Sequence, residues 1–130
     1  RRGPTWRETV LMHAVSRLAL HPLITNVQAS WVKLGLRGVT RLLAAGVNDA
    51  GGTLMDESIS RAAGAQHGQE LPPSAMDALI RAAGKIPQQR TTLYAAPPEA
   101  SRQASYDAPA LAEVVLTPVR RRRQSAPVAS

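Results

Sequence analysis

The stretch "ITNVQASWVKLGLRGVTRLLAAGVNDAGG", residues 24–52, decides the fold class because it joins two patterns of different period. Residues 24–32 alternate polar and apolar side chains and are rich in β-forming types, which predicts a strand. Residues 36–46 repeat apolar side chains at helical spacing and end in a glycine suited to closing a helix. Residues 47–49 predict a second, short strand or a turn. A strand, a helix and another strand with short links are typical of a parallel α/β sheet.

A helix is expected before this unit, within "PTWRETVLMHAVSRLALHP", residues 4–22. Thr5 and Glu8 have the spacing of a capping box, in which each side chain satisfies the other residue's free backbone N–H. Pro22 ends the helical pattern. Apolar residues recur three and four positions apart, which predicts one buried face made of Val10, Leu11, Ala14, Val15 and Leu18.

Further helices are expected after the unit. Residues 56–64, "DESISRAAG", begin with acids and end in glycine, which suits a short helix. Residues 74–84, "SAMDALIRAAG", predict another, with Ser74 and Asp77 at capping-box spacing. Residues 88–94, "QQRTTLY", predict an extended segment. Two or three strands cannot close a sheet, so the pattern indicates an incomplete piece of a larger α/β domain.

The composition changes after Tyr94, where Pro, Ala, Ser and Arg dominate. We therefore divide the chain into an ordered domain, residues 1–94, and a largely disordered tail, residues 95–130. The net charge is +7, and a basic balance favours anionic partners. The basic residues of the body are scattered singly, however, and the only dense run is Arg120–Arg123. We interpret that run as a solvated tail, which makes nucleic acid an unlikely partner.

Several classes of protein are excluded by residue types that the chain lacks. It contains no cysteine, so it has no disulfide scaffold, no cysteine zinc site and no ligands of its own for an iron–sulfur cluster. No apolar run approaches the roughly 18 residues of a membrane span, and no signal sequence follows the basic start. We expect a cytoplasmic protein without a membrane partner. The first residue is Arg rather than Met, which suggests a fragment.

The predicted strand carries a row of polar side chains, Asn26, Gln28 and Ser30, on the face opposite Val27, Ala29 and Trp31. Two interpretations stay open at this point. The row lies on an exposed edge strand, or it lines a cleft in which amides and a hydroxyl contact a polar substrate.

The stretch "GVNDAGGTLMDES", residues 46–58, combines amide, acids and glycines without matching a known loop. It lacks the acid spacing of a calcium loop and the patterns of Walker and dinucleotide-binding loops. What is left is a strand end, Asn48 and Asp49, followed by Gly51 and Gly52, which permit a positive φ or close approach of a ligand. Taken alone, this pattern also fits a plain turn.

Taken together, "NVQASWVKLG", "GVNDAGGTLMDESISRAAGAQHG" and "QQRTTLY", with "GPTWRETVLMHAVSRLAL" upstream, resemble the C-terminal stretch of the FO synthase family. The resemblance runs from Gly3 to Tyr94. The related aminofutalosine and dehypoxanthine futalosine synthases of menaquinone biosynthesis are the second choice, because they share the glycine pair and the N-x-Q-x-S-W pattern.

The resemblance implies a radical S-adenosylmethionine enzyme with a TIM-type barrel, which makes a deazaflavin cofactor precursor. In the full-length enzyme, a 4Fe–4S cluster held by three cysteines and S-adenosylmethionine generate a radical. That radical activates tyrosine, whose 4-hydroxybenzyl group is transferred to 5-amino-6-(D-ribitylamino)uracil. A ring-closing radical module is fused to the enzyme or acts as its partner. This chain would be the C-terminal part of the barrel, incomplete and inactive alone, with the remainder of its own barrel as partner.

The resemblance also turns the polar residues into expected substrate-binding residues: Asn26, Gln28, Ser30, Asn48, Asp49, Gly51 and Gly52. It identifies no catalytic residue and no metal ligand in this chain. A non-enzymatic basic protein that binds through Arg120–Arg123 stays an alternative.

Overall fold

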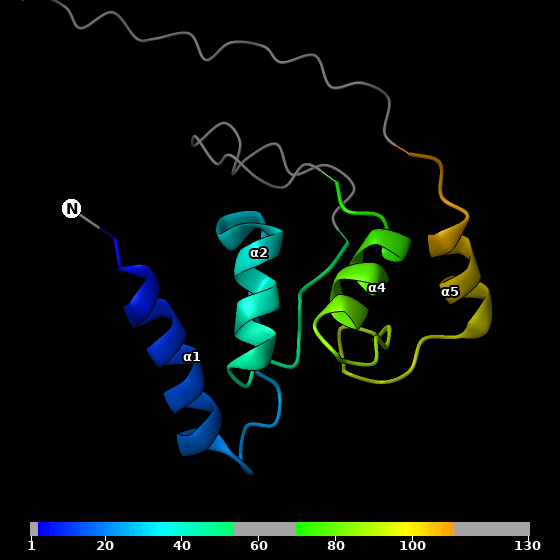
Figure 1. The fold of residues 1–130 in the computed structure, drawn as a ribbon. Helices are drawn as coiled ribbons and strands as arrows, with labels where there is room; N and C mark the ends of the chain where they lie inside the picture. The colour runs from blue at the N-terminus through cyan, green and yellow to red at the C-terminus, as the bar shows by residue number, and fades with distance from the viewer. Residues whose placement is uncertain (1–2, 54–69, 111–130) are drawn as a thin grey trace, which may run out of the picture.

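The computed structural model describes residues 3–53 and 70–110. Within these ranges the chain forms helices α1 (Trp6–Leu20), α2 (Trp31–Ala44), α4 (Pro73–Ala82) and α5 (Glu99–Tyr106), which follow one another across the molecule in chain order (Figure 1). The helix expected at residues 56–64 lies outside the described residues. Among the helices described, none has the length and apolar character needed to cross a membrane.

Helix α1 begins with the expected capping box. The Thr5 hydroxyl oxygen accepts from the Glu8 backbone N–H at 3.3 Å, and the Glu8 carboxylate accepts from the Thr5 backbone N–H at 2.6 Å. The hydrogen bond from the Thr5 backbone, and then that from its hydroxyl, lower the pKa of Glu8. The helix ends at Leu20, two residues before Pro22. The sequence prediction of this helix is confirmed at both ends.

The predicted buried face of α1 is wrong for the described structure, since no residue of this helix is buried. Leu11 is 50% exposed, Val15 58% and Leu18 81%. Val10 alone among the named residues packs at the edge of the core. The physical reason is that α1 contacts α2 along one side only, which leaves its apolar side without a neighbour among the described residues.

The strand expected at residues 24–32 is reduced to a single parallel bridge between Gln28 and Asp49. The Ala29 N–H donates to the Asp49 carbonyl at 2.9 Å, and the Asn48 N–H donates to the Val27 carbonyl at 3.2 Å. Beyond this bridge, residues 24–32 pair with no other segment as a strand among the described residues. The α/β prediction is therefore met by one parallel crossover through α2 and not by a sheet or barrel.

Helix α2 starts at Trp31, so the last two residues of the predicted strand, Trp31 and Val32, belong to this helix. The Ser30 carbonyl accepts from the N–H groups of Lys33 and Leu34 at 3.2 and 3.0 Å, which closes the first turn. Gly35, with φ 68° and ψ 169°, then interrupts the helix. The helical part after this kink matches the predicted 36–46 helix, and the positive φ of Gly46, 105°, confirms that glycine ends it.

The core is built around α2. Val39 and Leu42 are completely buried, because α2 lies between α1 and α4 (Figure 1). Gly38 is favoured in α2 because a Cβ there would lie 2.9 Å from the Leu34 Cβ; the Trp6 ring of α1, at 3.6 Å from that position, would be in ordinary van der Waals contact. The other buried apolar residues are Ala29, Trp31, Val32, Leu43, Val47, Ala50, Leu71 and Met76.

Helix α4 begins at Pro73 with Pro72 at its N-cap and no side-chain cap. The predicted capping box of Ser74 and Asp77 is therefore not formed. Proline suits the first turn because its φ is already helical and its missing N–H would have no partner there. Asp77 instead pairs with Arg81 at 3.1 Å and accepts from the Tyr106 hydroxyl at 3.0 Å.

Helix α5 lies in the region 95–130 that was expected to be largely disordered. It contacts α4 through the Tyr106–Asp77 hydrogen bond. It also contacts the segment after α4, because the Ser105 hydroxyl accepts from Gln89 at 2.9 Å. The region differs from the expectation because these long-range contacts, which local composition does not reveal, fix the helix. Residues 111–130, including Arg120–Arg123, lie outside the described residues.

The segment predicted to be extended, residues 88–94, forms no strand and ends in a turn. The Tyr94 N–H donates to the Thr91 carbonyl at 3.1 Å, and the Thr91 N–H donates to the Ala95 carbonyl at 2.8 Å. Tyr94 has φ 60°, a left-handed conformation that is uncommon outside glycine. The turn places the Tyr94 ring beside Arg90.

Candidate functional site

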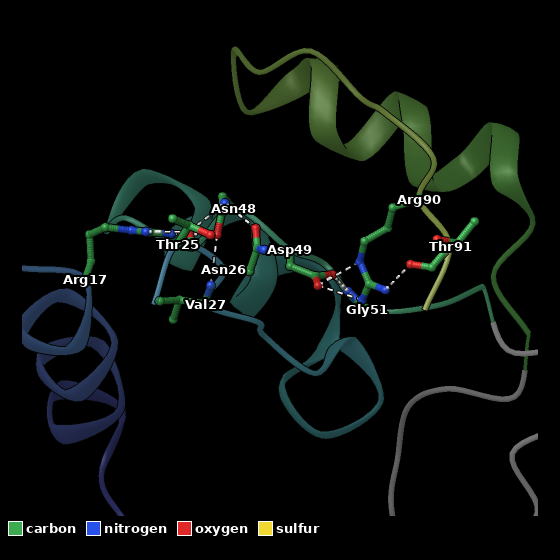
Figure 2. Close-up of polar contacts among 9 residues, drawn as sticks. All are labelled: Arg17, Thr25, Asn26, Val27, Asn48, Asp49, Gly51, Arg90 and Thr91. Carbon is green, nitrogen blue, oxygen red and sulfur yellow. Dashed lines mark hydrogen bonds and ion pairs between the residues drawn. The ribbon is translucent and has the colours of Figure 1, made fainter. Parts of the chain in front are cut away.

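A groove of about 990 Å³ lies between the bridge segments, α4 and residues 85–96. One wall is the chain from Gly46 to Thr53, and Tyr106 of α5 closes one end. Figure 2 shows the polar contacts along this wall, with Arg17 at one side and Arg90 at the other. The polar and charged side chains of the lining are Arg17, Asn26, Asn48, Asp49, Thr53, Asp77, Lys85, Gln88, Gln89, Arg90, Thr92, Tyr94 and Tyr106.

Arg17 of α1 ties three chain segments together (Figure 2). Its Nε donates to the Gly46 carbonyl at 2.7 Å, its Nη1 to the Thr25 carbonyl at 2.7 Å, and its Nη2 to the Asn48 side-chain oxygen. These acceptors are all neutral. A guanidinium presents its donors in a fixed fork, so Arg17 holds α1 against the starts of the two bridged segments.

Asn48 completes the same network. Its side-chain oxygen also accepts from the Val27 N–H at 2.9 Å, and its Nδ2 donates to the Thr25 carbonyl and to the Asn26 side-chain oxygen, each at 3.2 Å. The amide of Asn48 thus uses both its donor and its acceptor within the protein. Its first role in this structure is to fix the register of the bridge.

Asp49 is the buried acid of the site, with 7% of its surface exposed. One carboxylate oxygen accepts from the Gly51 N–H at 2.8 Å. The other accepts from Arg90 Nε at 2.9 Å and lies 2.6 Å from Arg90 Nη2. A buried carboxylate requires such partners because its desolvation is costly.

Arg90 reaches Asp49 from the opposite wall of the groove (Figure 2). Its Nη1 donates to the Thr91 carbonyl at 3.1 Å, and the Tyr94 ring centroid lies 4.3 Å from the guanidinium carbon. This geometry is a cation–π contact. Arg90 is thereby held in its plane by Asp49 and covered on one face by an aromatic ring.

The paired glycines differ in their roles. Gly51 has φ 81°, and a Cβ there would lie 3.0 Å from the Gln28 amide nitrogen, so this position needs glycine. Gly52 has open space around it, and its carbonyl accepts from the Trp31 indole N–H at 2.8 Å. The turn follows the carboxyl end of a bridged segment, where α/β proteins place their ligands.

The structure brings most of the expected substrate-binding residues to one groove. Asn26, Asn48, Asp49, Gly51 and Gly52 all line it. Gln28 and Ser30 do not.

These two residues leave the expected row because the pairing is limited to one bridge, at Gln28, and α2 begins directly after Ser30. Gln28 is exposed beside Gly51. Ser30 is the N-cap residue of α2, and its side chain makes no capping hydrogen bond.

Arg17 and Arg90 are the site residues that the sequence analysis missed. Arg90 is the only charged residue of the "QQRTTLY" segment, and the acid that it pairs with, Asp49, is buried. The signal that could have found it is the requirement that a buried Asp have a cationic partner. No such signal points to Arg17, because its acceptors are backbone carbonyls and one amide.

The residues of this chain do not fit an iron–sulfur cluster. The sequence contains no cysteine. In the part of the chain that the structure describes, no group of three His, Asp or Glu side chains gathers to hold a metal ion. The groove offers amides, paired charges and an aromatic ring instead, which suit a polar organic ligand.

A parallel crossover with a polar groove at its carboxyl end is the arrangement that α/β domains use to place their ligands. The chain belongs to the family described as the CofH/MqnC C-terminal region, whose model matches residues 2–103. No solved structure matches the chain significantly.

Curated relatives agree with this family. The chain is 55% identical over 94 residues to the 5-amino-6-(D-ribitylamino)uracil–L-tyrosine 4-hydroxyphenyl transferase of Methanopyrus kandleri. The matched segment covers 72% of this chain and 26% of that protein. It is 47% identical over 107 residues to the FO synthase of Streptomyces coelicolor, covering 82% and 12%. For transferase 1 of Methanosarcina mazei, the identity is 52% over 87 residues, covering 67% and 23%. The chain thus spans about a quarter or less of these relatives.

Proposed function

We propose that this chain is the C-terminal segment of a radical S-adenosylmethionine enzyme that joins tyrosine to 5-amino-6-(D-ribitylamino)uracil in deazaflavin biosynthesis. The observation that carries the proposal is the 55% identity over 94 residues to a transferase named for these two substrates. The segment's own contribution is one wall of the substrate cavity. The cluster that such an enzyme uses for radical generation would be held by cysteines outside this chain, which has none.

A TIM-type barrel for the complete enzyme is supported by the parallel bridge. Gln28 and Asp49 pair in parallel across α2, which is the basic repeat of such a barrel. A barrel extends this pairing through its other strands and closes without a free edge. The complete protein would therefore pair new strands beside residues 25–30 and 47–50.

The exposed side of α1 supports a partner within the same enzyme. Leu11, Val15 and Leu18 follow one another at helical spacing and are each at least half exposed. Such a stripe marks a contact surface. We propose that it packs on the remainder of the barrel, which the family description places before this C-terminal region. A ring-closing radical module is a further proposed partner, fused or separate.

The site we propose consists of Asn26, Asn48, Asp49, Gly51 and Gly52, which line the groove. Gln28 and Ser30, which do not line it, stay in the proposal as substrate contacts of the complete enzyme. The ribityl chain and the aminouracil ring carry many hydroxyl, carbonyl and N–H groups. Side-chain amides both donate and accept, so a wall of this kind suits that substrate. Within the wall, the Asp49 carboxylate accepts hydrogen bonds from Arg90 and from the Gly51 N–H, so its role is to hold these two groups.

A radical enzyme of menaquinone biosynthesis is the second candidate, since the family description also covers the MqnC region. The two candidates differ in product. The first forms a carbon–carbon bond between a tyrosine-derived fragment and an aminouracil, and the second acts on a futalosine-type substrate.

The test is an assembled enzyme, in which this chain replaces the matching C-terminal region of the M. kandleri transferase. After anaerobic cluster reconstitution, we expect it to form the coupled product from tyrosine and 5-amino-6-(D-ribitylamino)uracil, detected by mass spectrometry. The transferase lacking its C-terminal region is the control. Conversion of a futalosine-type substrate instead would favour the second candidate, and no turnover of either substrate would reject both.

The same assembly tests the α1 surface. Leu18→Asp places a charge on the proposed contact and should lower the yield of folded enzyme, whereas Leu18→Met keeps the apolar contact and should not. Equal yields from both variants would show that this side of α1 is exposed to solvent in the assembled enzyme and is not a contact surface.

A further inference from the structure

Arg90 has donors left over after its contacts with the other described residues. A guanidinium carries five N–H groups. Nε and one N–H of Nη2 face Asp49, and one N–H of Nη1 faces the Thr91 carbonyl. One N–H on each terminal nitrogen is therefore uncommitted. The side chain is 31% exposed and lines the groove, so these donors are within reach of a ligand.

The charge of Arg90 is already balanced by Asp49, whose side chain is 6% exposed. A ligand carboxylate on the same guanidinium would place a second negative charge beside the first, and like charges at this range repel. A neutral carbonyl oxygen accepts the same hydrogen bonds without that repulsion. The Arg90 guanidinium carbon also lies 4.3 Å from the centroid of the Tyr94 ring, and guanidinium and aromatic groups both stack on planar rings.

Gln89 supplies an independent observation in the same wall. Its Nε2 donates to the Ser105 hydroxyl at 2.9 Å, but its buried side-chain oxygen has no partner among the described residues. A buried acceptor without a donor is costly, and native structures rarely leave one. Gln89 also lines the groove. An N–H group on a bound ligand would satisfy it once the Gln89 side chain turns toward the groove, because the oxygen is closed to solvent in this structure.

We propose that Arg90, with Tyr94 and Gln89, forms a subsite for a planar, uncharged ring that carries both carbonyl oxygens and N–H groups. Arg90 donates to the ring carbonyls, and the Gln89 oxygen accepts from a ring or amino N–H. Asp49 is a positioning residue, which fixes the plane of the guanidinium. The inference rests on the proposed function, and it assigns this subsite to the aminouracil and not to the charged amino-acid end of tyrosine.

The test is steady-state kinetics of the assembled enzyme with each substrate varied in turn. Arg90→Lys keeps the charge but loses the planar fork, and we expect it to raise the KM for 5-amino-6-(D-ribitylamino)uracil about tenfold or more. The KM for tyrosine should stay within about twofold. Arg102→Lys is the matched control, because Arg102 pairs with Glu99 on α5 outside the groove, and it should change neither constant.

Gln89→Leu and Tyr94→Leu extend the test if Arg90→Lys lowers the amount of folded protein. Each should raise the KM for the aminouracil selectively, and equilibrium binding of the aminouracil alone should weaken in the same order. A selective rise in the KM for tyrosine, or no change in either KM, would overturn the subsite. Failure of the proposed function is distinguishable, since the unsubstituted assembled enzyme would then form no coupled product.

Discussion

Replacing Asp49 by Asn should loosen the groove locally, because it removes the negative charge that holds Arg90. Asparagine keeps an oxygen for the Gly51 N–H, so the substitution isolates the ion pair. Breaking a fully buried pair costs about 3–5 kcal/mol. Arg90 is 31% exposed, so water screens part of the interaction, and we expect a loss of about 2 kcal/mol.

Hydrogen exchange measures this loss without requiring the whole enzyme to unfold in one step. A local cost of about 2 kcal/mol corresponds to roughly 30-fold faster exchange of the amides that open with the pair. In the assembled enzyme, the effect should appear in peptides covering residues 46–53 and 88–96, which hold the two partners. Peptides from α1 should exchange at their original rate.

Asp77→Asn is the matched control, since Asp77 also lines the groove and pairs with an arginine. That pair is exposed, with side-chain exposures of 63% for Arg81 and 20% for Asp77, and pairs of this kind are worth about 0.3–0.5 kcal/mol. We expect a change of about twofold in exchange. If Asp49→Asn and Asp77→Asn gave equal effects, the claim that Arg90 is fixed by a buried carboxylate would be refuted.

Two further outcomes follow from the local geometry. Gly46→Ala should destabilise the assembled enzyme by about 1–2 kcal/mol or more in thermal denaturation, because φ is 105° and a Cβ would lie 2.9 Å from Arg17 Cγ; Gly52→Ala, with open space around it, should be close to neutral. Thr5→Ala should lower the helicity of a peptide spanning residues 3–22 at pH 7, measured by circular dichroism. Since the capping hydrogen bonds lower the pKa of Glu8 in the helix, its contribution is present above the unfolded pKa of about 4.3 and is lost as the pH falls through the lower folded value. The difference between the two peptides should therefore shrink in acid to the part that the Thr5 hydroxyl contributes by accepting from the Glu8 N–H. A difference that did not change with pH would show that Glu8 is not part of the cap.

Local signals in the sequence predicted the features that local interactions decide. The Thr5–Glu8 cap spans three residues, and the end of α2 at Gly46 needs only one residue with a positive φ. Both are confirmed. The resemblance to the FO synthase family is confirmed as well, because it depends on the order of several motifs along the chain.

Features that depend on distant partners could not be read in the same way. Residues 24–32 have the composition of a strand, but a strand needs neighbours, and in the described residues Gln28 pairs with Asp49 alone. The ion pair of Asp49 and Arg90 joins residues 41 positions apart. Helix α5 is fixed by contacts of Ser105 and Tyr106 with Gln89 and Asp77. None of these pairings leaves a periodic pattern in the sequence.

Isotope transfer in the assembled enzyme tests the central proposal most directly. Tyrosine labelled in its phenol ring is supplied with unlabelled 5-amino-6-(D-ribitylamino)uracil and S-adenosylmethionine, and the products are analysed by mass spectrometry. If this chain completes the substrate cavity, the label appears in a product that also contains the ribitylaminouracil. If the assembled enzyme is folded and carries its cluster but leaves all the label in tyrosine, the proposed function is contradicted.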